Sequence, residues 1–218
     1  MSSRTELNLW KKNLGSAPES LWDEVGIESL ILADNGLSSL SEGIGRLKNL
    51  RMLDLGHNQL AEVPEALGDL QQLDRFLYLH DNRLTTLPSS LGRLTRLRYL
   101  NISANAMTMM PEVVTDLSAL VELRATDNRL SEVPSSISRL GRLRELHLRN
   151  NLLTNLPESV GLLADLRQID LRGNPLKSLP AAIATLPRLE KLDLRWTPTL
   201  PTLPWFEALE ARGCLVYR

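Results

Sequence analysis

The sequence predicts an α/β solenoid, a stack of similar turns in which each turn adds one short strand and one return segment. Two observations predict this fold. Aliphatic residues recur at fixed places around a repeated asparagine. The asparagine itself returns every 23 residues, with one step of 24, at Asn35, Asn58, Asn82, Asn105, Asn128, Asn151 and Asn174. A period of this length is typical of repeat proteins, whose units bury their apolar faces against each other.

The first half of each copy predicts a strand. In the copy of Asn151, Leu143, Leu146 and Leu148 lie eight, five and three places before the asparagine. The Leu-x-Leu pair alternates as a strand does, so the leucines face the core and the residues between them face solvent. The asparagine then ends the strand. In stacked turns, such asparagines can form an internal ladder that pairs otherwise buried backbone groups.

The second half of each copy predicts a short helical turn. Aliphatic residues follow two and five places after the asparagine, a proline usually stands at six, and aliphatics return at nine and twelve. Pro157 is the proline of the Asn151 copy. Proline fixes φ at the start of the return segment, where a helical turn can begin.

The repeat organises the whole chain. Extending the frame puts Lys12 and Thr197 in the asparagine position, which gives about nine copies. We expect a single domain over residues 1–218, with an N-terminal capping repeat at about 1–26, repeats at about 27–200 and a C-terminal cap at about 201–218. Atypical end copies are expected because they face solvent instead of a neighbour. Met1 and the cap favour a complete repeat unit, but they also fit a domain cut before a catalytic half.

Both ends predict caps made of aromatic residues. At the N-terminal end, Trp10 and Trp22 are predicted to shield the first turn. At the C-terminal end we expect a short helix closed by Gly213 and a final strand from Cys214 to Tyr217. The side chains predicted to cover the last leucines are Trp205, Phe206 and Leu209.

Four copies depart from the pattern. The fourth is one residue longer between Leu73 and Leu77, which predicts a bulge that re-aims nearby side chains. Asp74 then falls in a leucine position and is expected to be pushed outward. Ser41 replaces the proline of the second copy. Softer packing is expected in the fifth and sixth copies, around Met107, Met109, Met110 and Ala125.

The pattern LxxLxLxxNxLxxLPxxIxxLxxL resembles the leucine-rich repeat family and covers nearly all of the 218 residues. Its Leu-Pro and GRL elements are similar to the 23-residue intracellular type found in Scribble-type scaffolds, plant Ras-group repeat proteins and bacterial effector repeat domains. The resemblance implies a right-handed horseshoe with a parallel β-sheet on the concave face and short helical or 3₁₀ turns and loops on the convex face. It also implies that the sheet binds proteins and that the repeats carry no catalysis.

Composition limits the classes of partner. The formal net charge is −1, which gives no general attraction to nucleic acid or membranes. The single cysteine excludes an intramolecular disulfide, and no stretch approaches the roughly 20 apolar residues of a membrane span. The N-terminus carries no apolar signal-peptide core. We therefore expect a cytoplasmic protein, or alternatively one delivered into a host cell without a cleavable signal peptide.

No enzyme motif appears. The sequence lacks a glycine-rich phosphate loop, a kinase signature and a G-x-S-x-G elbow. Cys214 has no histidine near it and is interpreted as a small buried hydrophobic residue. His57 and His80 can be neighbours, but no cysteine or third histidine completes a zinc set. We expect no catalytic residue, cofactor, metal or small-molecule substrate, and a monomer that binds a protein.

Residues that face away from the core form columns across the predicted sheet, and one group in them is aromatic. Outside the terminal copies the aromatic residues are Phe76, Tyr78 and Tyr99, all predicted on this face, with Met52, His57 and His80 beside them. Aromatic side chains on a solvent-facing sheet are typical of an interface hot spot. The alternative for Phe76 is that the bulge turns it inward as a core filler.

The second group is charged. One column ends in Arg149, Arg172 and Arg195, about 5 Å apart, with Trp196 beside them, and another column holds Arg124 and His147. Two interpretations remain open. Acidic residues in adjacent columns can neutralise the arginines in a surface network, or the arginines can bind an acidic or phosphorylated ligand.

These observations predict a non-enzymatic module that binds a partner protein on its concave face. The predicted partner-binding residues are Met52, His57, Phe76, Tyr78, His80, Tyr99, Arg124, His147, Arg149, Arg172, Arg195 and Trp196. One alternative is the substrate-recognition domain of a larger enzyme or secreted effector, such as a ubiquitin ligase or kinase. A second is a binder of acidic or phosphorylated ligands that uses the arginine row.

Overall fold

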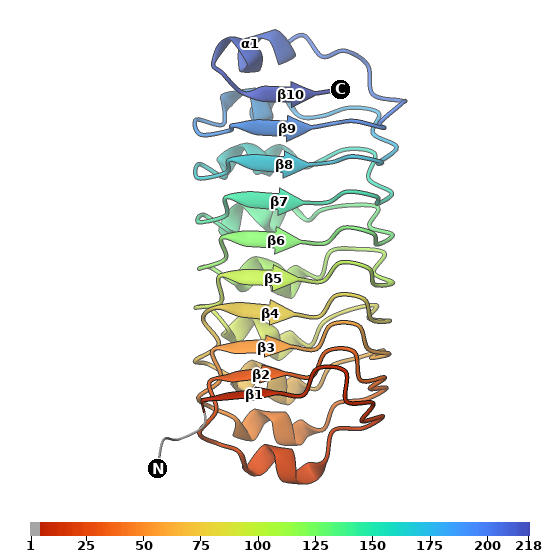
Figure 1. The fold of residues 1–218 in the computed structure, drawn as a ribbon. Coiled ribbons are helices and arrows are strands. Elements are labelled where there is room, and N and C mark those ends of the chain that lie inside the picture. Colours follow the sequence, from red (N-terminus) through yellow and green to blue (C-terminus); the bar gives the residue numbers. More distant parts are fainter. Residues whose placement is uncertain (1–4) are drawn as a thin grey trace.

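The computed structural model describes residues 5–218 as a right-handed solenoid with an open parallel sheet (Figure 1). Strand order follows chain order, so each strand pairs only with its neighbours in sequence. The strands of this described part are β1 (Glu6–Asn8), β2 (Ser29–Ile31), β3 (Met52–Asp54), β4 (Phe76–Tyr78), β5 (Tyr99–Asn101), β6 (Glu122–Arg124), β7 (Glu145–His147), β8 (Gln168–Asp170), β9 (Lys191–Asp193) and β10 (Leu215–Tyr217). The predicted fold class is confirmed.

Short 3₁₀ helices return the chain behind the sheet. They are η1 (Glu19–Asp23), η2 (Glu42–Arg46), η3 (Glu65–Asp69), η4 (Ser89–Arg93), η5 (Glu112–Asp116), η6 (Ser135–Arg139), η7 (Glu158–Leu162) and η8 (Ala181–Thr185). A proline precedes each of these helices except η2 and holds the backbone extended before the turn. Before η2, Ser41 replaces the proline, and its Oγ accepts a hydrogen bond of 3.1 Å from the Gly43 N–H.

The core between the sheet and these helices is continuous and mainly aliphatic. The middle residue of each strand from β1 to β9 is a buried leucine or isoleucine, while its two neighbours face outward. Two aromatic side chains are fully buried, Trp22 near one end and Phe206 near the other. Met107, Met110 and Ala125 are buried in consensus positions, while Met109 is exposed.

The predicted asparagine ladder is present. Asn151 shows its pattern: its Nδ2 donates to the carbonyls of Leu148 and Arg149 in its own turn and of Ala125 in the preceding turn, at 2.9, 3.3 and 2.9 Å. Its Oδ1 accepts from the Leu130 N–H at 2.9 Å. In the last copy Thr197 stands in the asparagine position, and its Oγ1 makes one of these bonds, to the Leu194 carbonyl. The ladder thus pairs backbone groups between turns.

The backbone is left-handed at the residue before each ladder position. Positive φ values of 52–60° occur there at Lys11, Asp34, His57, Asp81, Ala104, Asp127, Asn150 and Trp196, and Gly173 has a φ of 68°. This conformation lets the chain turn sharply from strand to loop. It is costly for most residues with a Cβ, but less so for asparagine and aspartate.

The extra residue of the fourth copy does not produce the predicted bulge. Leu73 is fully buried in the leucine position, and Asp74 is the added residue, placed before β4. Parallel strand pairing continues unbroken from β3 through β4 to β5. Asp74 turns away from the core and binds Arg51, with Nη2–Oδ2 at 2.7 Å. The extra residue lies in the turn before β4, because pairing with β3 and β5 fixes the register of β4 and leaves no place for it in the strand.

The two ends are closed differently. Trp22 is buried as predicted, but Trp10 is 56% exposed, so the expectation that it shields the first turn is wrong. At the other end, helix α1 (Phe206–Ala211) ends before Gly213, which has a φ of 86°, and β10 then extends the sheet (Figure 1). Phe206 and Leu209 are buried against the last turns. Part of the predicted N-terminal capping repeat, residues 1–4, lies outside the described residues.

No helix within residues 5–218 combines the length and apolar character needed to cross a membrane.

Candidate functional site

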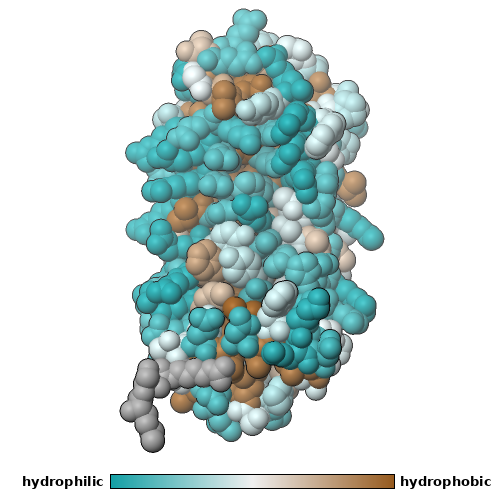
Figure 2. Space-filling model, viewed as in Figure 1, coloured by the Kyte–Doolittle hydropathy of each residue, from teal (hydrophilic) through white to brown (hydrophobic). Residues whose placement is uncertain are grey.

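The outward positions of the strands form columns as predicted, because the register is continuous across the sheet. Phe76, for example, pairs with Met52 on one side and Tyr99 on the other. All twelve predicted partner-binding residues lie on the strands or within three residues after a strand end. The structure separates them into an aromatic group on β3–β5 and a charged group on β6–β9. In Figure 2 pale and brown side chains gather over β3–β5, while hydrophilic side chains dominate over β7–β9.

The aromatic patch, defined as His57, Phe76, Tyr78, His80 and Tyr99, is a chain of five rings in contact. Phe76 lies 5.9 Å from Tyr78 and 5.5 Å from Tyr99 between ring centroids, and the two tyrosines are 5.1 Å apart. The ring centroid of His80 lies 5.9 Å from that of Tyr78 and 4.8 Å from that of His57. These distances are typical of favourable aromatic pairs.

Phe76 faces solvent and does not fill the core. Its side chain is 41% exposed, and Leu77 beside it is fully buried. The alternative that a bulge turns Phe76 inward is therefore wrong. Met52 is half-buried beside the patch, with its Sδ 3.7 Å from the Ser29 Oγ.

Burial changes the titration of the patch. It raises the pKa of Tyr99 to about 12, and it also raises the pKa of Tyr78, with the charge of Asp54 adding to the effect. Burial lowers the pKa of His80. Both tyrosines therefore keep their hydroxyl protons at neutral pH and can donate hydrogen bonds, and His80 favours its neutral form.

A glycine makes room for His80. A Cβ built on Gly56 would lie 2.4 Å from the His80 Cε1, so the imidazole occupies the space that a side chain would take. The Nδ1 of His80 is buried and has no hydrogen-bond partner in the described chain. His57 is more exposed and contacts the Asp81 carboxylate through its Nδ1.

In the charged group, each arginine of the predicted row has an aspartate partner. Arg172 binds Asp170, with Nη2–Oδ2 at 2.6 Å, and Arg195 binds Asp193 at 2.7 Å. Arg149 lies 3.3 Å from the nearest oxygen of Asp127. These pairs favour the interpretation in which the charges neutralise each other within the chain.

Asp193 is the most buried carboxylate of this network, with 1% of its side chain exposed. Burial alone would raise its pKa, but hydrogen bonds from Arg195 and the charges of Arg172 and Arg195 outweigh it and hold the pKa below its ordinary value. Asp193 is therefore ionised at neutral pH and binds arginines of two adjacent turns.

Two exposed aromatic residues lie beside the arginines. Trp196 is 68% exposed, and the guanidinium carbons of Arg172 and Arg195 lie 6.0 and 5.8 Å from its ring centroid. The ring centroid of Tyr217, on β10, lies 5.2 Å from the guanidinium carbon of Arg195. Sequence reasoning included Trp196 but missed Tyr217, because the C-terminal strand leaves the repeat period and its register cannot be counted.

Glu122, Glu145 and His147 form one cluster in which the possible ligand atoms lie within 4.8 Å of one another. Protein groups already engage them. The Arg124 Nε donates to Glu122 Oε1 at 2.5 Å, and the His147 Nε2 lies 3.0 Å from Glu145 Oε2.

Two cavities lie near the charged group. One of about 340 Å³ opens beside Trp196 and Phe206, and one of about 250 Å³ lies between Arg124, His147 and Arg172. The arrangement suits recognition of polar groups.

A family model described as Leucine rich repeat matches residues 26–84, 75–130 and 141–198. Among curated proteins, human vasorin is 39% identical over 70 residues, 32% of this chain and 10% of vasorin. The human volume-regulated anion channel subunit LRRC8A is 37% identical over 82 residues, 37% of this chain and 10% of that subunit. The matched part thus spans about a tenth of these relatives.

Solved structures share the fold. The leucine-rich repeat domain of the type III effector XopL has a TM-score of 0.80 at 24% identity, covering all of this chain and 77% of that one. An internalin from Listeria monocytogenes has a TM-score of 0.81 at 22% identity, with 97% and 60% covered. The ectodomain of the Arabidopsis thaliana receptor kinase GASSHO1, solved with CASPARIAN STRIP INTEGRITY FACTOR 2, has a TM-score of 0.75 at 31% identity, with 87% and 24% covered.

Proposed function

Because this chain belongs to the leucine-rich repeat family, we propose that it is a non-enzymatic recognition module that binds a partner protein on its concave face. One observation carries the proposal: five aromatic rings touch one another on the outward face of β3–β5, although the core of these turns is aliphatic. Rings that do not stabilise the interior are available to a partner.

The aromatic patch has the physical properties of a binding hot spot. Tyrosines and phenylalanine bury large areas with few rotatable bonds, so ordering them on binding costs little conformational entropy. Their contacts with one another already restrict them. The hydroxyls of Tyr78 and Tyr99 add hydrogen-bond donors to an apolar surface. The GASSHO1 ectodomain, solved with a bound factor, supports this class of function.

The charged group would supply specificity beside this anchor. Paired charges contribute little affinity when they stay hydrated, but they disfavour partners with the wrong charge pattern. The pairing of all three row arginines with aspartates weighs against the alternative of a general binder of acidic ligands. Cytoplasmic location and the monomeric state stay predictions.

The test compares two folded triple variants in quantitative affinity capture. Phe76→Ala, Tyr78→Ala and Tyr99→Ala together remove the patch, and Met109→Ala, Leu152→Ala and Leu162→Ala together remove exposed apolar side chains elsewhere. A hot-spot residue contributes about 2 kcal/mol, so each patch change should lower affinity roughly 30-fold. Partners should be lost only with the patch variant. If every partner survives in a folded patch variant, the proposal fails.

A further inference from the structure

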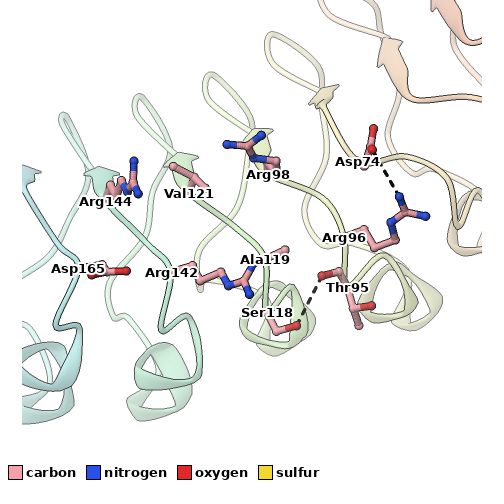
Figure 3. A pocket seen from close by; sticks show the side chains of 10 residues that line it. All are labelled: Asp74, Thr95, Arg96, Arg98, Ser118, Ala119, Val121, Arg142, Arg144 and Asp165. Atoms are coloured by element: carbon pink, nitrogen blue, oxygen red, sulfur yellow. Dashed lines mark hydrogen bonds and ion pairs between the residues drawn. The ribbon is translucent and has the colours of Figure 1, made fainter.

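A groove lined by arginines runs along the edge of the solenoid where the return segments enter β5, β6 and β7. Its volume is about 790 Å³. Figure 3 shows Arg98 and Arg144 on either side of Val121, with the Arg142 side chain reaching toward Ala119. The groove is separate from the outward face of the strands that carries the aromatic patch.

The groove exists because one turn has small side chains where its neighbours have arginines. Ala119 is in register with Arg96 and Arg142, one repeat to each side, and Val121 is in register with Arg98 and Arg144. A short side chain between two long ones leaves a notch at that turn. The notch has an apolar floor and walls that end in guanidinium groups.

Three of these arginines have no partner within the described chain. No carboxylate of residues 5–218 forms an ion pair with Arg98, Arg142 or Arg144, and their side chains make no hydrogen bond there. Two other edge arginines are paired, Arg51 with Asp74 and Arg167 with Glu190. The groove therefore holds three unneutralised positive charges.

The acidic residues of the groove are already occupied. Asp74 binds Arg51 at 2.7 Å and lies 3.6 Å from the nearest nitrogen of Arg96, a pair drawn in Figure 3. Asp165 contacts Arg188. Neither carboxylate is left to neutralise the three free guanidinium groups, so an external anion can pair with them without displacing an internal partner.

We propose that this groove binds an extended acidic segment of a partner protein. Arg98 and Arg144 belong to turns two strand spacings apart, about 10 Å along the axis. In an extended chain, carboxylates three residues apart are separated by about the same distance. A single phosphate spans only a small part of that distance, whereas an acidic segment offers several carboxylates along it. Guanidinium–carboxylate pairs are charge-assisted and form two parallel hydrogen bonds when the geometry allows.

The probe for the test is a fluorescein-labelled peptide, Glu-Ala-Ala-Glu-Ala-Ala-Glu, with Gln-Ala-Ala-Gln-Ala-Ala-Gln as its neutral counterpart. Binding is measured by fluorescence anisotropy on the full chain. Arg98→Gln, Arg142→Gln and Arg144→Gln together remove the free charges. The matched control, Arg83→Gln, Arg129→Gln and Arg212→Gln, changes the net charge equally at exposed arginines outside the groove.

The wild type and the control should bind the acidic peptide, and the groove variant should bind at least about tenfold more weakly. The neutral peptide should not bind, and raising the salt from about 50 to about 200 mM should weaken binding. Val121→Glu places a carboxylate in the notch and should also abolish binding.

Three results would overturn the proposal. One is an equal loss in both triple variants, which would indicate a general charge effect. Another is the absence of binding to the wild type. The third is displacement of the peptide by inorganic phosphate at a similar concentration, which would make the groove a phosphate site. The triple alanine variant of the aromatic patch should bind the probe as the wild type does, so this proposal and the proposed function fail independently.

Discussion

At the scale of single residues, the left-handed position before each ladder asparagine combines strain with exposure. Asp34, Asp81, Asp127, Asn150 and Gly173 are residue types that tolerate a positive φ. His57 is also of a type enriched there, whereas Lys11, Ala104 and Trp196 are not, and these three hold the same conformation because the neighbouring turns fix it. Of these three, Trp196 belongs to the predicted partner-binding set.

Replacing Ala104 with glycine should therefore stabilise the protein. Glycine adopts a φ of 52° without the penalty of a Cβ, and relief of that penalty should exceed its greater unfolded-state entropy by about 1 kcal/mol. Urea denaturation measures the change. The control is Ala106→Gly two residues later, where φ is not positive. That variant should lose stability, and equal effects at both positions would contradict the strain argument.

Asp193 should make stability depend on pH. Because its pKa is lowered by Arg195 and Arg172, its charge stabilises the fold fully above the ordinary aspartate pKa of about 4. That contribution is lost as the pH falls through the lowered pKa. Asp193→Asn should cost about 2 kcal/mol near pH 7 and much less near pH 2.

Urea denaturation at both pH values tests this, with Asp116→Asn as the control. Asp116 pairs with Arg139 on the exposed convex side, where ion pairs contribute little. A cost for Asp193→Asn that does not shrink in acid would show that packing, and not charge, makes Asp193 important.

The sequence predicts the column of each outward residue, but not the partner of each long side chain. The columns that hold Phe76, Tyr78 and Tyr99 follow directly from counting places before each asparagine. The partners of the arginines do not, because a long side chain can reach a neighbour in its own turn or the next. Arg172 does both, with Asp170 and Asp193. The ion-pair partner of each arginine therefore follows from the three-dimensional structure and not from the repeat pattern.

At the scale of the elements, the asparagine ladder holds adjacent turns together. Asn151 connects its own turn to the turn before, because its amide donates to the Ala125 carbonyl and its Oδ1 accepts from the Leu130 N–H. Asn174 repeats this link one turn later, where its Oδ1 accepts from the Leu153 N–H. Strands of three residues offer few ladder bonds of their own. The side-chain ladder adds bonds at the point where each strand ends.

Replacing Asn151 with alanine should destabilise the protein by about 3 kcal/mol. The change leaves the Leu130 N–H buried without its partner. It also removes the shorter of two bonds to the Ala125 carbonyl and one of two bonds to the Leu148 carbonyl. Thermal or urea unfolding measures the loss. Asn155→Ala serves as the control, since Asn155 is exposed and bonds only the adjacent Leu156 N–H. Similar costs at the two sites would argue against the ladder.

Elements were predictable where the period holds and less so where it breaks. The proline before each 3₁₀ helix except η2 and the alternating aliphatic residues of β2–β9 predicted the positions of both. The bulge expected at Asp74 was wrong because local counting cannot decide whether an extra residue enters the strand or the turn before it. Pairing with β3 and β5 decides this, and it favours the turn.

At the scale of the whole molecule, each turn is stabilised by its neighbours, so the ends matter most. Phe206 and Leu209 of α1 are buried against the last turns and replace the missing next repeat. In a nearest-neighbour stack, loss of a cap destabilises the adjacent turns first.

Phe206→Ala should cost about 3–5 kcal/mol locally. Amide hydrogen exchange should then become faster in β9 and β10 while β4 and β5 keep their protection. Leu100→Ala, in the middle of the sheet, is the control and should increase exchange in the central strands instead. Uniform acceleration along the chain in the Phe206 variant would show that the solenoid unfolds as one unit.

The strictly sequential strand order also makes the solenoid a ruler. Adjacent strands are about 4.8 Å apart, so the number of turns between Tyr99 and Arg172 sets the distance between the two groups. Duplication or loss of one 23-residue unit in the gene would change that distance by a single strand spacing, without rebuilding either group. Evolution can thus fit this surface to a longer or shorter partner in whole steps.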